Sequence, residues 1–337
     1  METRTGERED TYAMAVDVSA FTAMARAEFM QGKLAADNRV QPAAHDAFVT
    51  TLPSTTRVET HTYMSNLPRL REFKGYTPST RLVSTSYTVE NKTYRVGPLI
   101  VDQQDLDDDQ VGGYMLSIKG LPEQGKKDIG FRQLDKIAAG ATDLCFDGTA
   151  FFADSHTVGS GDNLMTANNA SNDAVTHYLI AMVLTNPTIK PLIFQDRQSL
   201  SGLETDADTP QARKVRSYEY WADCRFGLAY GFWWDAIRMT ITDTPSLTEL
   251  QGHVKDLIDR FRTFTLPKGA DVDSAMYTHE GWMPSADNFT ILCNMSLGEL
   301  LGVIQTESLI AAGTSGATIT NQYKGRFTAL PTSALGA

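Results

Sequence analysis

The strongest pattern in the chain is an alternation of polar side chains with apolar or β-branched ones. It runs over residues 83–89, stops at the polar triplet 90–92, and resumes over 94–100. A period of two residues is that of a β-strand, so the pattern predicts a hairpin whose turn is the triplet. Two isolated strands are only marginally stable in water. We therefore expect this polar hairpin to need a partner, and that partner to be another copy of the chain.

A helical pattern follows the hairpin. Apolar residues recur at i, i+3, i+4 and i+7 over 111–118, and the apolar stripe continues toward Gly140, which is the spacing of one helix face. The aspartates 107–109 are expected in its first turn, where the helix dipole favours negative charge. Pro122 and Gly125 predict a kink or a split in this helix.

Three shorter helices are predicted from the same period. One begins with Ser19 as its cap and ends near residues 32–33, and two others carry the Ser and Glu of a capping box at 246–249 and 296–299. Their apolar faces are Phe21, Met24, Ala25 and Phe29; Leu247, Leu250, Val254, Leu257, Ile258 and Phe261; and Leu297, Leu300, Leu301 and Ile304.

Strands and turns fill much of the remainder. The pair Asp147–Gly148 predicts a turn between apolar strands, while residues 157–173 and 203–211 are predicted loops because Gly, Asn, Ser or acidic residues dominate them. Strands are predicted over 178–184, 190–195, 215–242, 289–293 and 320–331. The mixture of helices and strands indicates an α+β fold.

Composition narrows the function classes. With 337 residues, 42% hydrophobic, the chain can bury a sizeable core, and it has neither an apolar run long enough for a membrane span nor a signal peptide. A net charge of -11 disfavours a protein whose main task is to grip nucleic acid, although a container wall around DNA is compatible with it. Its three cysteines form no CxxC pair, so we expect free, buried thiols in a reducing compartment.

The order of hairpin, acidic run and long helix resembles that of the major capsid proteins of Mu-like tailed phages. The segments that carry the resemblance are Leu67–Phe73 (LPRLREF), Tyr87–Tyr94 (YTVENKTY), Asp105–Gln110 with Gly113 and Tyr114, Leu144–Gly148 with Phe151 and Phe152, Ile189–Gln195 (IKPLIFQ), and Tyr218–Arg225 with Tyr230–Trp233. They cover most of the chain after about residue 50.

The resemblance implies an α+β Hong Kong 97-type major capsid fold. Its parts would be an N-terminal arm at 1–55, an E-loop at 56–101, a P-domain at 102–242 with a spine helix at about 105–141 and β-strands, and an A-domain with the C-terminal strand at 243–337. One departure concerns the segment 247–330, which precedes the KPLIFQ and YEYWADCR strands in relatives and follows them here. The order of the A-domain would then be permuted, and its boundary with the P-domain stays open.

The function that the resemblance implies is self-assembly into the icosahedral head shell that encloses the double-stranded DNA of a tailed phage. The partners would be hexamers and pentamers of the chain itself, a scaffold, a portal and decoration proteins, with DNA contacted non-specifically and no membrane. The protein would be located in the virion capsid after assembly in the host cytoplasm. Two alternatives are an encapsulin-like compartment of the same fold and a metal-dependent hydrolase built on the histidines.

No enzyme and no cofactor are predicted, and no residue is assigned a catalytic, cofactor-binding or metal-binding role. The metal hypothesis rests on six histidines and above all on Asp154 and His156, which would share one face of a strand. An isolated Asp-x-His is more often a hydrogen-bonded pair, and no HExxH accompanies it. The histidines are His45, His61, His156, His177, His253 and His279.

Other candidate chemistry is weaker. The chain has no GxSxG motif, residues 159–161 lack the Lys of a phosphate-binding loop, and the acidic run 105–109 lacks EF-hand spacing. Lys74 or Lys92 could serve an isopeptide cross-link, but the sequence identifies no Asn partner or catalytic Glu, so none is predicted. The aromatic group within 218–234 lacks interleaved basic residues and is expected to pack in the core and at subunit interfaces.

Overall fold

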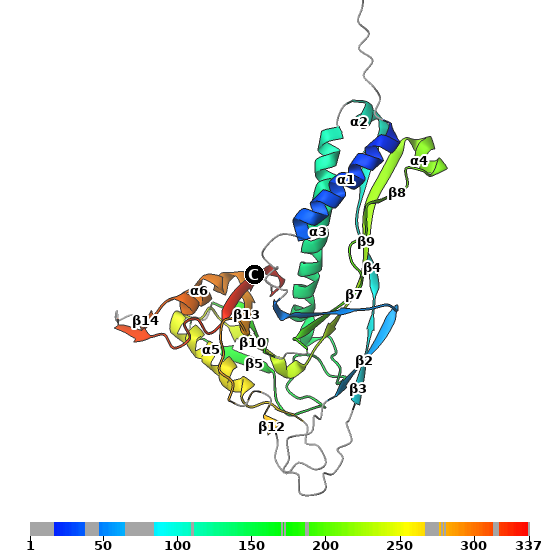
Figure 1. Cartoon of the computed structure of the whole chain (residues 1–337). Helices are drawn as coiled ribbons and strands as arrows, with labels where there is room; N and C mark the ends of the chain where they lie inside the picture. The colour runs from blue at the N-terminus through cyan, green and yellow to red at the C-terminus, as the bar shows by residue number, and fades with distance from the viewer. Residues whose placement is uncertain are drawn as a thin grey trace, which may run out of the picture. The chain divides into compact units, whose positions relative to one another are not determined.

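Two units make up the computed structural model, and each is assembled from three separate stretches of the chain (Figure 1). Unit 1 comprises 1–40, 93–128 and 198–225, and unit 2 comprises 41–92, 129–197 and 226–337. Within these ranges the structure describes residues 17–37, 47–64, 84–108, 111–169, 171, 173–185, 189–266, 276–277, 279, 281–312 and 317–335.

The first helix of unit 1, α1 (Val18–Asp37), is capped by the residue before it. The Asp17 carboxylate accepts the backbone N–H of Ser19 at 3.2 Å and also its hydroxyl, so the prediction of Ser19 as the cap is wrong. Phe21, Ala25 and Phe29 are buried as predicted. Met24 was wrongly included in the buried face, since it is 44% exposed. The predicted helix was also too short, because α1 continues to Asp37.

The long helix predicted after the hairpin is α3 (Val111–Ala138), and it is not split at Pro122. A proline removes one backbone hydrogen bond, and the bonds on either side keep this helix continuous. The aspartates do not occupy its first turn. Asp107 ends a separate short helix, α2 (Gln103–Asp107), Asp108 follows as its C-cap, and no acidic residue lies in the first turn of α3.

Within unit 1, α1 lies along α3 at very short range. A Cβ atom added to Gly32 would lie 2.1 Å from the backbone oxygen of Lys119. Ion pairs flank this contact, since Lys119 binds Glu28 at 3.0 Å and Lys126 pairs with Asp37. Glycine at position 32 therefore sets the distance between the two helices.

The strands of unit 1 meet at β9 (Ser217–Tyr230), which neighbours β4 (Lys92–Asp102) and pairs with β8 (Glu204–Thr205). Burial alternates along β9, as a strand with one covered face requires. The predicted acidic loop 203–211 contains β8 and the start of a short helix, α4 (Pro210–Val215). The core of this unit is Phe21, Ala25, Phe29, Val101, Leu106, Ile118, Leu203, Ala207, Ala212, Tyr218, Tyr220 and Ala222.

Unit 2 contains a five-stranded sheet in the order β16-β13-β6-β10-β5. β6 is antiparallel to both neighbours, whereas β5 is parallel to β10 and β16 to β13. Every residue of β13 is buried, so both faces of this interior strand are covered. The predicted loop 157–173 contains β5. The strand bounds are β5 Leu164–Asn168, β6 Thr176–Val183, β10 Ala236–Thr242, β13 Phe289–Asn294 and β16 Thr328–Thr332.

Two helices of unit 2 test the predicted capping boxes. In α5 (Leu247–Phe261), the N–H of Glu249 donates to the Ser246 hydroxyl at 3.3 Å and the N–H of Ser246 donates to the Glu249 carboxylate at 2.8 Å, so that box is confirmed. The second box is wrong. Before α6 (Gly298–Thr306), Ser296 belongs to a 3₁₀ turn and its hydroxyl contacts a ring nitrogen of His177 at 3.2 Å.

The predicted hairpin has the right strands with the wrong pairing. β3 (Ser84–Glu90) pairs antiparallel with β2 (Val58–Met64), from Val58 opposite Glu90 to Met64 opposite Ser84, while β4 neighbours β9. The triplet 90–92 is thus no hairpin turn. Most of the Pro/Arg-rich segment, residues 65–83, connects β2 to β3 and lies outside the described residues.

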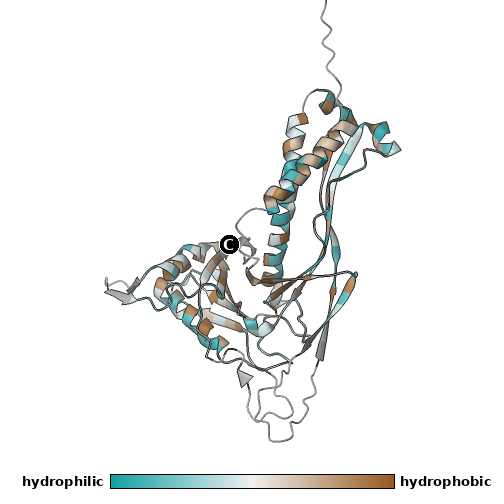
Figure 2. Ribbon diagram, viewed as in Figure 1, coloured by the Kyte–Doolittle hydropathy of each residue, from teal (hydrophilic) through white to brown (hydrophobic). Residues whose placement is uncertain are grey.

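The remaining elements of unit 2 are short. β1 (Val49–Pro53) runs parallel to β7 (Leu192–Gln198), and Figure 2 shows the hydropathy of the residues that are not drawn in grey. The others are η2 Ala139–Ala141, η3 Trp233–Asp235, β11 Thr265–Leu266, β12 Met276–Tyr277, η4 Met295–Leu297, β14 Leu309–Ala312, β15 Ala317–Thr320 and η6 Ser333–Leu335. Among the described helices, none combines the length and apolar character needed to cross a bilayer.

Replacing Gly32 with alanine should destabilise unit 1 by roughly 1–3 kcal/mol, because the new methyl group can be accommodated only if α1 and α3 move apart. Gly120→Ala is the matched control, since Gly120 is also helical and a Cβ there meets nothing within 4 Å. It should raise stability by up to about 1 kcal/mol. Urea denaturation followed by circular dichroism measures both, and equal curves for the two variants would contradict the close approach.

Candidate functional site

The first candidate site is the pair β2 and β3, called here the ribbon. One face of the ribbon, which includes Val58 at 51% exposure, is open to solvent, while on the other face Val89 is buried and Tyr87 packs against the core of unit 2. Among the described side chains, these apolar contacts hold the ribbon at the end near Glu90.

Asn91 fixes that end of the ribbon. Its side-chain amide donates to the Ser54 hydroxyl at 2.7 Å and to the Thr56 carbonyl at 2.8 Å, and its backbone N–H donates to the Arg57 carbonyl at 2.8 Å. A Cβ on Gly227 would lie 2.8 Å from Val89 and 3.0 Å from the Glu90 carbonyl. These contacts turn the chain out of β3 and explain why the triplet does not form a hairpin.

Polar contacts extend this anchor to β2 and β7. The Glu59 carboxylate accepts the Ser54 hydroxyl at 2.7 Å and the N–H of Thr55 at 2.8 Å, which lowers the pKa of Glu59. His61 contacts the Gln195 side-chain oxygen at 2.8 Å, and the Gln195 amide donates to Ser54 at 3.2 Å. The ribbon thus begins from a fixed, hydrogen-bonded base.

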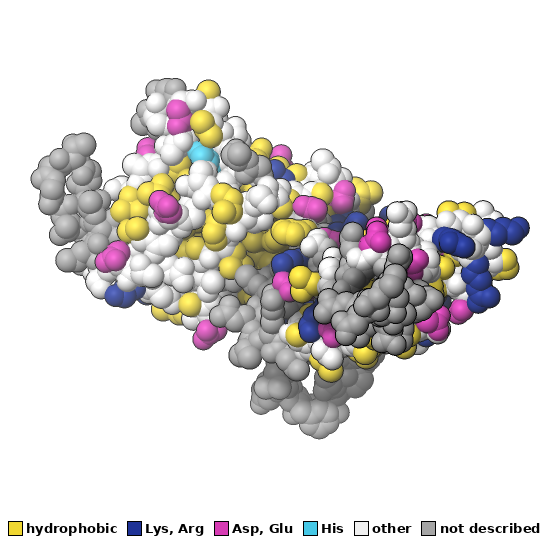
Figure 3. Space-filling model, turned by 90° about the horizontal axis from the view of Figure 1, so that it is seen from above, with side chains coloured by type: hydrophobic (Ala, Val, Ile, Leu, Met, Phe, Trp, Pro, Cys, Tyr) yellow, Lys and Arg dark blue, Asp and Glu magenta, His cyan; other side chains and the backbone are white. Residues whose placement is uncertain are grey.

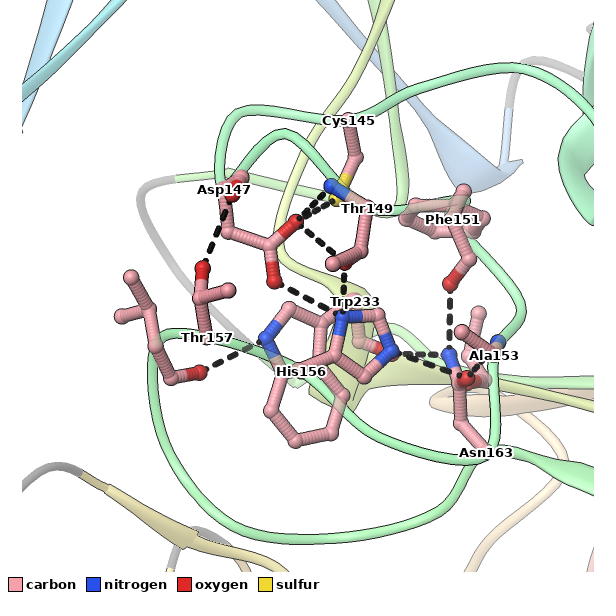
Figure 4. Close-up of polar contacts among 11 residues, drawn as sticks. Cys145, Asp147, Thr149, Phe151, Ala153, His156, Thr157, Asn163 and Trp233 are labelled. Atoms are coloured by element: carbon pink, nitrogen blue, oxygen red, sulfur yellow. Dashed lines mark hydrogen bonds and ion pairs between the residues drawn. The ribbon is translucent and has the colours of Figure 1, made fainter.

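The second candidate site is a buried polar cluster formed around the predicted Asp147–Gly148 turn (Figure 4). The turn is confirmed: Gly148 has φ +79°, and the N–H of Cys145 donates to the Thr149 carbonyl at 2.8 Å. The apolar strands predicted on either side are not formed. Only a single bridge, between Leu144 and Ala150, is present, because the residues on both sides of the turn pack into the core instead of pairing as strands.

Asp147 is the acceptor of this cluster. One carboxylate oxygen accepts the Cys145 thiol at 2.9 Å and the Thr149 hydroxyl and N–H at 2.6 and 3.0 Å, while the other faces His156 Nδ1 at 2.8 Å. Burial acts to raise the pKa of Asp147, but the hydrogen bonds from His156, Cys145 and Thr149 outweigh it and hold that pKa well below its usual range. Burial and the bond to Asp147 raise the pKa of the Cys145 thiol to about 12.

His156 bridges Asp147 and Asn163 through its two ring nitrogens. Nε2 lies 3.1 Å from the Asn163 side-chain oxygen, and the Asn163 amide nitrogen faces the carbonyls of Phe151, Trp233 and Ala236 at 2.8, 3.0 and 3.1 Å. Nδ1 lies 2.8 Å from the Asp147 carboxylate. The ring also stacks on Trp233 with 4.0 Å between centroids and 1° between planes, so it is fixed on both edges and on one face.

The metal hypothesis named the wrong partner for His156. Asp154 is exposed, whereas Asp147, nine positions earlier, has no exposed side-chain surface and contacts the ring. Ligand atoms of Cys145, Asp147 and His156 all lie within 4.8 Å of one another, and S, O and N donors suit zinc. Metal binding would require a thiolate, which the raised thiol pKa opposes, and a ring nitrogen released from its contact with Asp147 or Asn163. The geometry favours a hydrogen-bonded network.

The other histidines fall at separate places. Burial lowers the pKa of His177, His253 and His279, which contact Thr244, Asn169 and the Trp234 carbonyl respectively. His61 belongs to the ribbon base. His45 lies outside the described residues, as does Lys74.

The aromatic group packs as predicted for a core. Phe151 stacks on Tyr230 with 4.5 Å between centroids, and the Tyr230 hydroxyl donates to the Lys136 carbonyl at 2.6 Å. In the acidic run, Asp105 accepts the Tyr114 hydroxyl at 2.5 Å, which raises the pKa of Tyr114 to about 12.

Asp147→Asn should destabilise the chain by about 1–3 kcal/mol at neutral pH, because it replaces the ionised partner of the buried hydrogen bonds with Cys145, Thr149 and His156. Asp154→Asn, which changes an exposed carboxylate seven positions later, should stay within roughly 0.5 kcal/mol of the parent. Guanidinium denaturation compares the three. Equal losses for both variants would show that the cluster has no special role.

The parent and the Asp147→Asn variant also give a test of pH dependence. Since the pKa of Asp147 is lowered on folding from its usual 3.8, its ionised form stabilises the fold above that pH and the benefit is lost as pH falls below it. The difference in unfolding free energy between the parent and Asp147→Asn should therefore be full at pH 7 and shrink below about pH 4. A difference that grows on acidification would have the wrong sign.

Comparison with known proteins gives a consistent result. The family model described as the Mu-like prophage major head subunit gpT matches residues 18–251. The chain is 28% identical over 199 residues to the Mu-like prophage FluMu major head subunit of Haemophilus influenzae, covering 57% of this chain and 64% of that protein. It is 24% identical over 202 residues to the major capsid protein of Escherichia phage Mu, covering 58% and 66%. The match thus spans just under two thirds of these curated relatives.

Solved structures share the fold. A chain of the bacteriophage JBD30 procapsid aligns with a TM-score of 0.65 at 21% identity over 95% of this chain and 100% of that one. A chain of the JBD30 capsid gives 0.65 at 18% identity over 89% and 93%. The predicted α+β, Hong Kong 97-type capsid fold is confirmed. With the family model matching well over half of its length, this chain belongs to the Mu-like prophage major head subunits.

Proposed function

We propose that this chain is the major capsid protein of a tailed phage and that it self-assembles into an icosahedral shell around double-stranded DNA. The ribbon carries the proposal. Its two strands pair with each other along seven positions and are fixed at one end by Asn91 and Glu59. A paired, polar arm that is anchored at its base, as far as its side chains are described, is suited to bind a neighbouring copy rather than a small substrate.

The chain's charge fits a container. A net charge of -11 keeps a wall from adhering to the phosphates it encloses, so DNA would be contacted weakly and without sequence preference. Many weak contacts between subunits are sufficient for a stable shell, because closure of the shell makes them act together.

The expected division into arm, E-loop, P-domain and A-domain belongs to this proposal. In this division, the ribbon and residues 65–83 would belong to the E-loop, and α3 would be the spine helix. A boundary between 242 and 243 would divide one sheet, because β13 and β16 share it with β5, β6 and β10. Scaffold, portal and decoration proteins as partners, assembly in the host cytoplasm, and the absence of enzymatic activity are further parts of the proposal. One structural relative is described as a JBD30 capsid decorated with minor capsid protein trimers, which favours a decoration partner.

An encapsulin-like compartment is the alternative that uses the same architecture. Electron microscopy of the purified chain at high concentration tests both, since closed shells are expected from each. Packaged nucleic acid in particles from phage-producing cells supports the capsid proposal, whereas an enclosed protein supports the compartment. A chain that stays monomeric under all conditions would contradict both.

Shortening the ribbon gives a sharper test. Replacing residues 65–83 with Asn-Gly joins Met64 to Ser84 through a two-residue turn that suits their antiparallel pairing. The shortened chain should keep its circular dichroism spectrum and unfolding midpoint, because the base of the ribbon is retained. It should lose shell formation, because the segment proposed to contact the neighbouring copy is removed. Closed shells from this folded variant would show that the segment has no essential part in assembly.

A further inference from the structure

The most basic stretch of unit 1 lies at α4. Arg213, Lys214 and Arg216 are all exposed, and Val215 between them is 64% exposed. Figure 3 shows Lys and Arg side chains gathered at the right-hand end of the view, the side on which Figure 1 places α4, with Asp and Glu side chains beside them. Three cations and an exposed valine in four residues are unusual in a chain of net charge -11.

Local structure holds these side chains outward. Thr209 caps α4 by accepting the N–H of Ala212 at 3.2 Å, and Ala212 is buried. Arg216 ends the helix in the left-handed region, with φ +58°, and its N–H donates to the Ala212 carbonyl at 2.8 Å. A non-glycine residue is held in that conformation only where its surroundings fix it. The basic tip is therefore well defined rather than a loose loop.

An acidic segment lies directly beside it in the same unit. The Arg216 carbonyl accepts the N–H of Gln103 at 2.8 Å, which joins the end of α4 to the start of α2. Asp102, Asp107 and Asp108 are exposed around α2. Within the described residues, the α4 cations make one salt bridge, Arg213 to Asp208 at 3.4 Å with both side chains largely exposed, and none to the α2 aspartates.

We propose that α4 of one copy binds the α2 segment of a second copy, with Arg213, Lys214 and Arg216 facing Asp102, Asp107 and Asp108 and with Val215 covered between them. A patch that carries both signs side by side is complementary to the same patch on another copy. DNA is a poorer partner, since the aspartates next to the cations repel phosphate. This proposal rests on the proposed self-assembly and specifies one of its contacts.

Charge exchange tests it. The variants are Arg213→Glu with Lys214→Glu, Asp107→Lys with Asp108→Lys, and all four together, and each is first checked for the parent's urea denaturation curve. Each double variant should require on the order of tenfold more chain to assemble, measured by light scattering, since like charges then face each other. The fourfold variant should return close to the parent value.

The net charges provide the internal control. The two double variants change the net charge in opposite directions, and the fourfold variant leaves it unchanged. An effect of total charge therefore cannot weaken assembly in both double variants and restore it in the fourfold variant. Folded doubles that assemble like the parent, or a folded fourfold variant that does not recover, would overturn the contact. Loss of assembly in the Arg213→Glu, Lys214→Glu variant alone, together with lower nucleic acid content, would assign α4 to DNA instead. A parent chain that never assembles would instead contradict the proposed function.

Discussion

A two-stranded ribbon buries too little apolar surface to hold itself in place, and much of the local structure around β2 and β3 answers that constraint. Asn91, Ser54 and Glu59 supply directional hydrogen bonds where the ribbon leaves the core. Gly227 leaves room for the Val89 side chain and the Glu90 carbonyl to approach. Hydrogen bonds suit this role better than apolar packing, because they are directional and fix the angle at which the ribbon leaves the core.

The polar cluster solves a different problem, that of folding an irregular segment into the core. Residues 144–163 contain no long strand, so their backbone groups need partners other than a sheet. Asn163 alone contacts the backbone of Phe151, Ala153, Trp233 and Ala236. The hydrogen bond between Asp147 and His156 then holds the turn closed. His156, on which the metal hypothesis rested, thus takes part in a hydrogen-bonded network that stabilises a loop.

Local features of the sequence predicted the fold most reliably. The capping box at Ser246, the period of α3, the tight turn at Gly148 and the strand character of 84–102 depend on neighbours along the chain, and the structure confirms each. Pairing was not predictable in the same way. Alternation identifies β3 and β4 as strands but does not say that β3 pairs with β2 and β4 lies beside β9, since partner choice depends on Asn91 and on residues far away. His156 shows the same limit, because a distance of nine residues to Asp147 has no helical or strand period that would reveal the contact.

The interleaving of the two units has a consequence for synthesis. Unit 1 needs the strand segment around Tyr220 to cover α1, and the main sheet of unit 2 is complete only with β16. Neither core can close while the early segments alone have left the ribosome, although the ribbon strands are made within the first third of the chain. Contacts between distant segments form late during folding. The base of the ribbon is itself complete only after Gln195 and Gly227 have been made, so the proposed association between copies can begin only well after the ribbon strands have been translated.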